Sequence, residues 1–178
     1  MLEVRRLEPD DDRSGFRSGN PELDRFFARY AGQNQFRHHV GTTYVAMEGE
    51  AICGFVTVSA SEIAVDALPK GRRKRLPRYP LPVLRLARLA VSERHRGRGL
   101  GELLLETVFR VAPELRDLSG CVGVVVDAKS EAVGFYRRYG FERIDVVEGE
   151  LGDRPGPLPM FLSLGAVPDP RSAADGEP

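Results

Sequence analysis

The sequence lacks several features that would place it in a special class of protein. Only two of its 178 residues are cysteine, which excludes a scaffold held together by disulfides. No apolar run approaches the roughly 18 residues that a membrane-spanning helix needs, and no charged segment followed by an apolar stretch marks a signal peptide at Met1. The sequence therefore predicts a soluble, cytoplasmic protein with no membrane partner, in which Cys53 and Cys121 are buried free thiols.

The composition is that of one folded domain. The chain is 42% hydrophobic and 29% charged, which provides enough apolar side chains for a core, and its length is close to the usual size of a single domain. The C-terminal segment is rich in Pro, Asp, Gly and Ser, so we expect it to be disordered. The sequence thus predicts a domain over residues 1–165 and a tail over residues 166–178.

A net charge is also absent, because 26 basic residues balance 26 acidic ones. The balance is not local, however. Residues 1–69 carry 7 basic and 11 acidic side chains, residues 70–98 carry 11 and 1, and residues 99–178 carry 8 and 14, so the net charges are −4, +10 and −6. A basic block inside a neutral chain indicates an anionic partner for one face of the protein.

Hydrophobic periodicity predicts a mixed α/β fold. Strand-like runs occur at residues 2–7, 42–47, 52–59, 84–91, 121–126, 141–147 and 159–164. Helical spacing covers residues 100–115 and 130–139, and a further helix is expected after Asn20, where Leu23, Phe26, Phe27 and Tyr30 form an apolar stripe. The strand, helix and strand between residues 84 and 126 should form a right-handed crossover into parallel pairing.

The most specific local motif is the segment Arg96 to Gly101, RGRGLG, at the junction of a predicted central strand and an amphipathic helix. The first N–H groups of a helix lack intrahelical partners and lie at the positive end of its dipole, so this loop is suited to a phosphate or pyrophosphate. Glu102 and Leu103 stand where a P-loop needs Lys and Ser or Thr, and the third glycine of a dinucleotide-binding fingerprint is missing. A turn that only joins strand to helix is the structural alternative.

A second motif, AVGFYRRYGF, occupies residues 132–141. Together with the glycine loop, it is specific enough to indicate a family. An Arg-Gly-x-Gly-x-Gly loop after a strand, followed by a strand and a helix that ends in Phe-Tyr-x-x-x-Gly-Phe, resembles the GNAT superfamily of acyl-CoA-dependent N-acyltransferases. The resemblance covers residues from about 2 to 164. It implies a central mixed sheet of six to seven strands flanked by about four helices, and acetyl-CoA as co-substrate.

In that family the strand before the loop pairs its backbone with the pantetheine arm, which implies Leu89, Ala90 and Val91 here. The loop that holds the pyrophosphate would comprise Arg96, Gly97, Arg98, Gly99, Leu100 and Gly101. The resemblance places Tyr136 near the thioester sulfur, where a phenol is able to protonate the departing thiolate, with Tyr139 as the next choice. Lys129 departs from the family pattern, because many members have Asn at this position.

Within the superfamily, three segments resemble the GNAT toxins of bacterial toxin–antitoxin modules: NPELDRF from Asn20, TTYV from Thr42 and LARLAV from Leu86. Those enzymes acetylate the α-amino group of aminoacyl-tRNA and block translation. The resemblance implies a ribbon-helix-helix type antitoxin as partner and a basic loop before the central strand. The residues that would bind tRNA are Arg72, Arg73, Lys74, Arg75, Arg78 and Arg88.

The predicted central strand carries no carboxylate, because its polar positions are Arg85 and Arg88. An α-amino group has a pKa of about 7.7 to 8.0 against about 10.4 for lysine, so an α-amine acceptor needs little help from a base. Glu62 and Asp66 remain candidate bases that would act through water. His38, His39 and His95 show no metal-ligand spacing, so we predict no metal.

Two other functions stay open at this point. The first is a general GNAT enzyme that acts on a small-molecule amine, a protein N-terminus or lysine. The second is a non-catalytic module that binds CoA or nucleic acid. A homodimer is also left open, because the sequence does not determine the oligomeric state.

Overall fold

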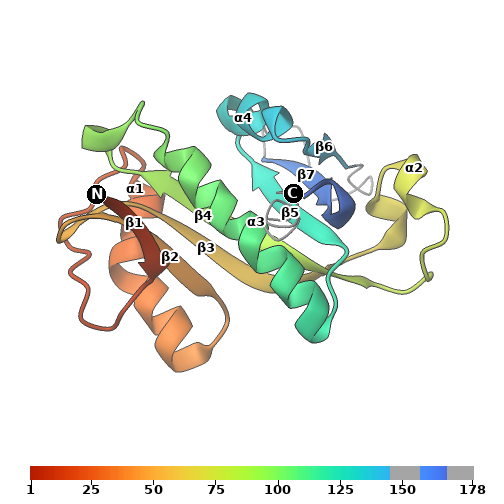
Figure 1. Ribbon diagram of the computed structural model, residues 1–178, viewed down its shortest axis with the longest axis horizontal. Coiled ribbons are helices and arrows are strands. Elements are labelled where there is room, and N and C mark those ends of the chain that lie inside the picture. Colours follow the sequence, from red (N-terminus) through yellow and green to blue (C-terminus); the bar gives the residue numbers. More distant parts are fainter. Residues whose placement is uncertain (145–156, 168–178) are drawn as a thin grey trace, which may run out of the picture. The chain divides into compact units, whose positions relative to one another are not determined.

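The computed structural model describes residues 1–144 and 157–167. Within them, seven strands form a sheet in the order β1-β2-β3-β4-β5-β7-β6 (Figure 1). The strands are β1 (Leu2–Arg6), β2 (Thr42–Glu48), β3 (Ala51–Ile63), β4 (Leu81–Val91), β5 (Gly123–Ala128), β6 (Glu142–Arg143) and β7 (Leu158–Ser163). The α-helices are α1 (Pro21–Arg25), α2 (Lys70–Arg73), α3 (Leu100–Ser119) and α4 (Val133–Arg138). The predicted mixed α/β fold is confirmed.

The chain divides into two compact units. The first comprises residues 1–59 and 86–108, and the second comprises residues 60–85 and 109–178. Strands β3 and β4 and helix α3 each contribute residues to both units. Each unit has an apolar core cluster of its own.

In the first unit, strands β1, β2 and β3 are antiparallel neighbours. The β2–β3 hairpin turns at Gly49, whose φ of 62° lies in the left-handed region that glycine adopts without strain. The hairpin predicted from the sequence is confirmed, and β3 runs on to Ile63, beyond the predicted end at Ser59.

Helix α1 begins as the sequence predicts. The Asn20 Oδ1 atom accepts hydrogen bonds from the N–H groups of Glu22 (3.0 Å) and Leu23 (3.2 Å), which caps the helix. After Arg25 the chain continues as a π-helix, η1 (Phe26–Tyr30), and a second π-helical segment, η2 (Gln33–His38), follows. The wider π turn rotates later residues around the axis, so the prediction that Tyr30 joins the buried stripe is wrong: its exposed fraction is 46%.

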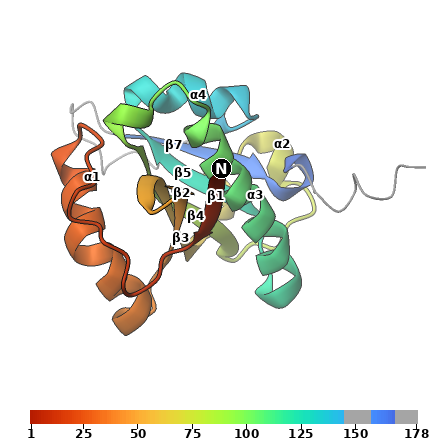
Figure 2. The same ribbon diagram turned by 60° about the vertical axis from the view of Figure 1, so that its left-hand side comes forward.

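The core of the first unit is aromatic. The Phe27 ring, which is fully buried, stacks on the Phe55 ring with centroids 4.3 Å apart and an interplanar angle of 5°, and Phe16 meets both rings edge-on at 5.0 and 5.5 Å. Gly54, the residue before Phe55, faces the other side of the strand, where a Cβ atom would lie 3.0 Å from Ala90 O and from Leu104 Cδ1. In Figure 2, α1 and the first turns of α3 lie on opposite sides of these strands.

In the second unit, β5 and β6 both pair antiparallel with β7. The core cluster of this unit consists of Ile63, Leu68, Leu81, Val83, Val125 and Phe161. The strand predicted over residues 141–147 is observed only as β6, and residues 145–147 lie outside the described residues. Phe141 is instead buried at the end of the α4 segment, where its N–H donates to Tyr136 O (3.2 Å).

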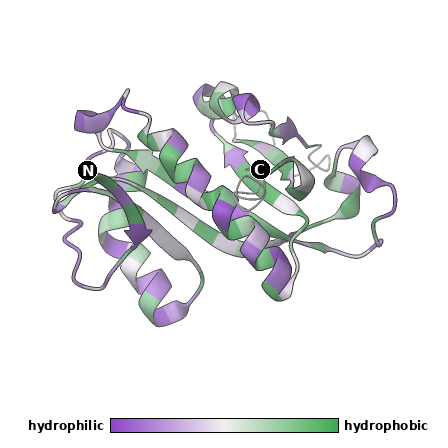
Figure 3. Ribbon diagram, in the orientation of Figure 1, coloured by the Kyte–Doolittle hydropathy of each residue, from purple (hydrophilic) through white to green (hydrophobic). Residues whose placement is uncertain are grey.

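Several smaller features complete the fold. Helix α3 extends to Ser119 despite Pro113, and hydrophobic and hydrophilic residues alternate around it (Figure 3). Cys53 and Cys121 are buried and free, as predicted.

No helix of the described residues has the length and apolar character to cross a bilayer. Val167 is buried after a final 3-10 turn, η6 (Leu164–Ala166), and residues 168–178 of the predicted tail lie outside the described part of the chain.

The stacked Phe27 ring should contribute much of the stability of the first unit. We expect Phe27→Ala to lower the free energy of unfolding by about 3–5 kcal/mol, because it removes a fully buried aromatic ring and leaves a cavity. Urea unfolding followed by circular dichroism measures the change. Tyr30→Ala is the control, with a change within about 0.5 kcal/mol. Equal losses in both variants would show that the stack is not the dominant contact.

Candidate active site

The glycine loop joins β4 to α3 and has an open side. A short 3-10 turn, η4 (Glu93–His95), leads from β4 into the loop, where Gly97 and Gly99 have φ angles of 73° and 74°. A Cβ atom built on either glycine would meet nothing within 4 Å. Glycine is thus required here by the backbone conformation, not by crowding, and the space in front of the loop is free for a ligand.

Helix α3 starts directly behind this space. The Leu103 N–H donates to Gly99 O (3.0 Å), and the N–H groups that precede it have no carbonyl within the helix to bind. They lie at the positive end of a 20-residue helix. Free N–H groups and the helix dipole together favour an anion such as a pyrophosphate at the loop.

The two arginine side chains of the loop are engaged with the protein. Arg96 donates a hydrogen bond to the carbonyl oxygen of Ser18. Arg98 binds both carboxylate oxygens of Glu48, at 2.7 and 3.2 Å, and this hydrogen bonding holds the pKa of Glu48 below its usual range. The anion site in this state therefore rests mainly on backbone amides, and contacts from these two side chains to a cofactor stay predictions.

The strand residues predicted to line the cofactor lie in the same unit as the loop. Ala90 is buried, whereas Leu89 and Val91 are half-buried. Arg88, just before them, stacks its guanidinium 3.8 Å from the centre of the Phe26 ring, and desolvation there lowers the pKa of Arg88. Phe26 is thus a neighbour of the site that the sequence indicated only as a core residue.

Tyr136 lies in α4 in the second unit. Its ring is buried against the edges of Phe135 and Phe141, with centroids 5.2 and 5.4 Å away, and this burial raises the pKa of the phenol to about 12. Such a phenol stays protonated at neutral pH and is able to donate a proton.

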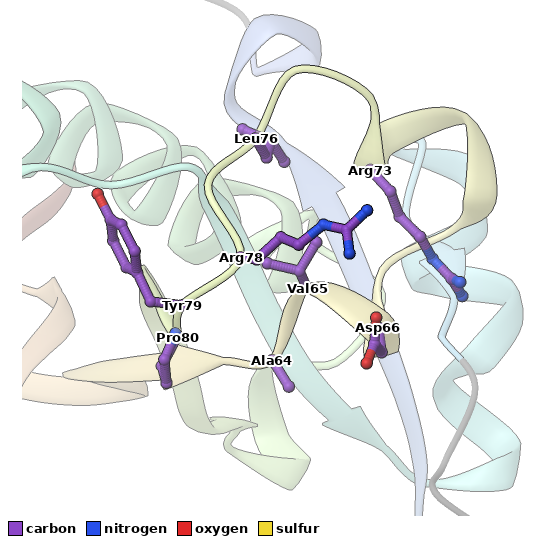
Figure 4. A pocket seen from close by; sticks show the side chains of 8 residues that line it. All are labelled: Ala64, Val65, Asp66, Arg73, Leu76, Arg78, Tyr79 and Pro80. Carbon is purple, nitrogen blue, oxygen red and sulfur yellow. The ribbon is translucent and has the colours of Figure 1, made fainter.

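The basic segment, residues 70–78, precedes β4 and also belongs to the second unit. It contains the single turn of α2, and a 3-10 turn, η3 (Val65–Ala67), comes just before it. Arg72 forms an ion pair with Glu142 (3.6 Å) and the Arg73 Nε–H donates to Leu68 O (2.8 Å). This segment surrounds a pocket of about 560 Å³ (Figure 4), lined by Ala64, Val65, Asp66, Arg73, Leu76, Arg78, Tyr79 and Pro80.

One cluster was missed by the sequence analysis. Glu48, Cys53 and His95 place a carboxylate oxygen, a thiol sulfur and an imidazole nitrogen within 4.8 Å of one another, which is the donor set of a transition-metal site. Glu48 is already bound to Arg98, and His95 Nδ1 lacks the second partner that a ligating histidine usually has. The absence of a metal remains a prediction. Glu48 and Cys53 lie on the same hairpin, but His95 is more than 40 residues further along the chain, so no local spacing signals the cluster.

The predicted residues thus fall into two groups. The first unit holds the cofactor residues from Leu89 to Gly101 together with Arg88, and the second holds Tyr136 and the basic segment. Of the other polar candidates, Arg85 is engaged by Asp127 at 2.9 Å and Ser61 at 3.4 Å, and Asp66 lines the pocket of Figure 4.

The strand, glycine loop and helix of the first unit are suited to an anion, and the second unit contains a tyrosine able to donate a proton. Comparison with known proteins identifies the family. The model of the Acetyltransferase (GNAT) domain matches residues 39–143, more than half of the chain. A tRNA-acetylating toxin of Mycobacterium tuberculosis (strain ATCC 25618 / H37Rv) is 32% identical over 139 residues, which are 78% of this chain and 82% of that protein.

Solved structures share the fold of this chain. A crystal structure of a tyrosine-to-phenylalanine mutant of KacT has a TM-score of 0.80 and 26% identity, covering 93% of this chain and 96% of that one. AtaT complexed with acetyl-methionyl-tRNAfMet has a TM-score of 0.80 and 22% identity, covering 94% and 97%. The protein belongs to the GNAT acetyltransferases. The predicted family, its resemblance to the GNAT toxins and the enzyme class of N-acetyltransferase are confirmed.

The pKa of Tyr136 has a measurable consequence. Its value of about 12 lies above the value of about 10 for an exposed phenol, so folding favours the neutral form. This contribution to stability is complete below about pH 10 and is lost as the pH rises toward the folded-state pKa. We expect an ultraviolet phenolate titration to show one transition near pH 12 that is absent from Tyr136→Phe. A Tyr136→Phe titration identical to wild type would contradict the burial of this phenol.

Proposed function

We propose that the protein is the toxin of a toxin–antitoxin system, which transfers the acetyl group of acetyl-CoA to the α-amino group of aminoacyl-tRNA and thereby blocks translation. The relative named a tRNA-acetylating toxin supports this proposal over most of the chain. The fold likeness to AtaT, which was solved with acetyl-methionyl-tRNAfMet, is consistent with it.

Acetyl-CoA would bind in the first unit. The N–H groups of the loop from Arg96 to Gly101 would hold its pyrophosphate, and the backbone of Leu89, Ala90 and Val91 would pair with the pantetheine arm. The free space in front of Gly97 and Gly99 supports this assignment. A structural neighbour, AtaTR bound with AcCoA, has a TM-score of 0.75.

Tyr136 would act as the general acid. The α-amine nitrogen attacks the thioester carbonyl carbon, an amide bond forms and the carbon–sulfur bond breaks. The Tyr136 hydroxyl donates its proton to the departing thiolate, the proton that the amine loses passes to water, and the Tyr136 phenolate regains a proton from water. A phenol with a pKa of about 12 is fully protonated at neutral pH, so each turnover starts with the acid in its active form.

The residues of strand β4 favour an α-amine as the acceptor. Strand β4 contains no Asp or Glu, so the site offers no base on that strand for a lysine with a pKa of about 10.4. An α-amine with a pKa of about 7.7 to 8.0 is partly neutral at physiological pH and needs none. Glu62 and Asp66 are not required as bases in this scheme.

One observation favours aminoacyl-tRNA over other amine acceptors: the basic segment is exposed and most of its charge is not neutralised. Residues 70–78 contain six cations and no acidic residue, and the only ion pair formed there by the described residues is Arg72 with Glu142. Free cations on one face favour contacts to phosphates. We assign tRNA binding to Arg72, Arg73, Lys74, Arg75, Arg78 and Arg88.

An antitoxin is the second expected partner. The neighbours include AtaT bound to the C-terminus of the antitoxin AtaR and the KacTA–DNA complex. We propose a ribbon-helix-helix type antitoxin with an acidic or amphipathic segment, because such a segment would cover the basic face of the toxin. A homodimer and the absence of a metal are part of the same proposal.

Replacing the phenol tests the catalytic assignment. We expect Tyr136→Phe to lower kcat for acetylation of aminoacyl-tRNA by about 10²-fold or more, because the thiolate then departs unprotonated. Transfer of radiolabelled acetyl groups to aminoacyl-tRNA measures the rate, and Tyr30→Phe is the matched control. Unchanged turnover in Tyr136→Phe together with a loss in Tyr139→Phe would move the acid to Tyr139. Wild-type activity on free amines or peptides but not on aminoacyl-tRNA would refute the proposed acceptor.

A charge at the loop tests the cofactor assignment. Gly99→Asp should abolish CoA binding in calorimetry, because a carboxylate would lie beside the pyrophosphate. Gly99→Asn has nearly the same shape and the same backbone demand, so we expect it to bind CoA more than about tenfold more tightly than Gly99→Asp. If both variants bind like wild type, the pyrophosphate does not lie at this loop.

A further inference from the structure

The segment that leads into helix α1, residues 17–19, contacts the turn that leads into the glycine loop (Figure 2). Arg17 O accepts a hydrogen bond from the Glu93 N–H (2.9 Å). The next carbonyl oxygen, that of Ser18, accepts a hydrogen bond from the guanidinium of Arg96. Both segments belong to the first unit. The glycine loop is therefore anchored at its first residue by a main-chain oxygen that lies 78 positions earlier in the chain.

The two segments approach each other closely at Gly19. The φ angle of Gly19 is 87°, which glycine adopts without strain. A Cβ atom built on Gly19 would lie 2.6 Å from Glu93 Oε1 and 2.9 Å from Arg96 Nη2. Both the backbone conformation and the available space therefore require glycine at this contact.

Ser18 is held in turn by helix α1. Its N–H and its hydroxyl both donate to Asp24 Oδ1, at 2.8 and 2.6 Å, and its Oγ atom accepts from the Asn20 N–H (3.2 Å). Ser18 is buried, and a buried polar residue whose groups all have partners is fixed in one orientation. Asp24 thus fixes the residue whose carbonyl oxygen receives Arg96.

These contacts give a role to a carboxylate that the proposed reaction does not use. Asp24 belongs to the NPELDRF segment, and among the described residues it forms no ion pair, because its Oδ1 atom is taken by Ser18. Arg96 is bound to a neutral carbonyl oxygen, whereas Arg98 is paired with the carboxylate of Glu48. The anchor on Arg96 therefore fixes the loop without neutralising a positive charge beside the anion site.

We propose that Asp24 is a positioning residue for acetyl-CoA, which acts through Ser18 and Arg96 to fix the start of the glycine loop before the cofactor binds. The proposal rests on the proposed function, because it assumes that the pyrophosphate of the cofactor lies at this loop. Gly97 and Gly99 have more conformational freedom to lose than other residues. A loop that is ordered in advance loses less of this freedom on binding, so its affinity is higher without any contact between Asp24 and the cofactor.

Removal of the carboxylate tests the anchor. We expect Asp24→Ala to raise the Kd for acetyl-CoA in calorimetry, and its KM, about tenfold. The kcat at saturating acetyl-CoA should stay at the wild-type value, because Tyr136 lies in the other unit. Asp24→Asn keeps an accepting oxygen for Ser18 and should bind acetyl-CoA nearly as well as wild type. Equal Kd values for Asp24→Ala and wild type would overturn the proposal.

Asn20→Ala is the matched control, because it weakens α1 without removing the anchor. The Asn20 side chain caps α1, whereas its contact with Ser18 is made by the main-chain N–H. We expect Asn20→Ala to lower the free energy of unfolding in urea and to keep the wild-type Kd for acetyl-CoA. If Asn20→Ala raises the Kd as much as Asp24→Ala does, a loosened helix causes the effect and the proposal is wrong.

Hydrogen exchange tests the order of the loop directly. In the absence of cofactor, the amides of residues 97–99 should exchange faster on the millisecond timescale in Asp24→Ala than in wild type or Asn20→Ala, because the loop opens more often. A raised Kd with unchanged exchange would show that Asp24 does not act by ordering the loop, and it would refute the proposal.

The outcomes distinguish this proposal from the proposed function. A wild-type protein that binds no acetyl-CoA would refute the proposed function, and with it the role of Asp24 in cofactor binding. A wild-type protein that binds acetyl-CoA and acetylates aminoacyl-tRNA, with no change of Kd in Asp24→Ala, would refute the positioning role alone.

Discussion

The candidate active site depends on one constraint of the backbone: the chain must pass from strand β4 into helix α3 through two residues with positive φ. Only glycine adopts this conformation without strain, and Gly97 and Gly99 satisfy it. The turn leaves the first N–H groups of a 20-residue helix facing open space. An anion is favoured there whatever the nearby side chains do, because the donors belong to the main chain.

This constraint explains how the charges of the protein are distributed. Arg96 and Arg98 belong to the anion loop, yet they bind Ser18 and Glu48 and help to hold the loop in place. The cations of residues 70–78 are mostly unpaired among the described residues. The backbone amides of the loop are therefore suited to one anion, and the side chains of residues 70–78 are suited to a second. A neutral chain is able to offer both because the acidic residues lie mainly elsewhere in the sequence.

Features that depend on neighbouring residues were predictable. The Asn20 cap, the β2–β3 hairpin and the glycine loop each require particular residues within a few positions of one another, and all three are observed. The prediction that Tyr30 is buried was wrong because the chain forms a π-helical turn there, which changes the face of the helix that Tyr30 occupies. No local residue pattern indicated this turn. The residues of the candidate site could be listed from family motifs, but the residues with which their side chains form hydrogen bonds and ion pairs could not.

The sequence by itself determined the family, the order of the elements and the chemical type of each candidate residue, since these follow from local patterns and from motif spacing. Only the tertiary structure decided which side chains are engaged and which are free. Glu48 reaches Arg98 across 50 positions of the chain, and burial among aromatic rings raises the pKa of Tyr136. Both effects depend on distances between residues that are remote in sequence or on exclusion of water, and neither is encoded in a local pattern.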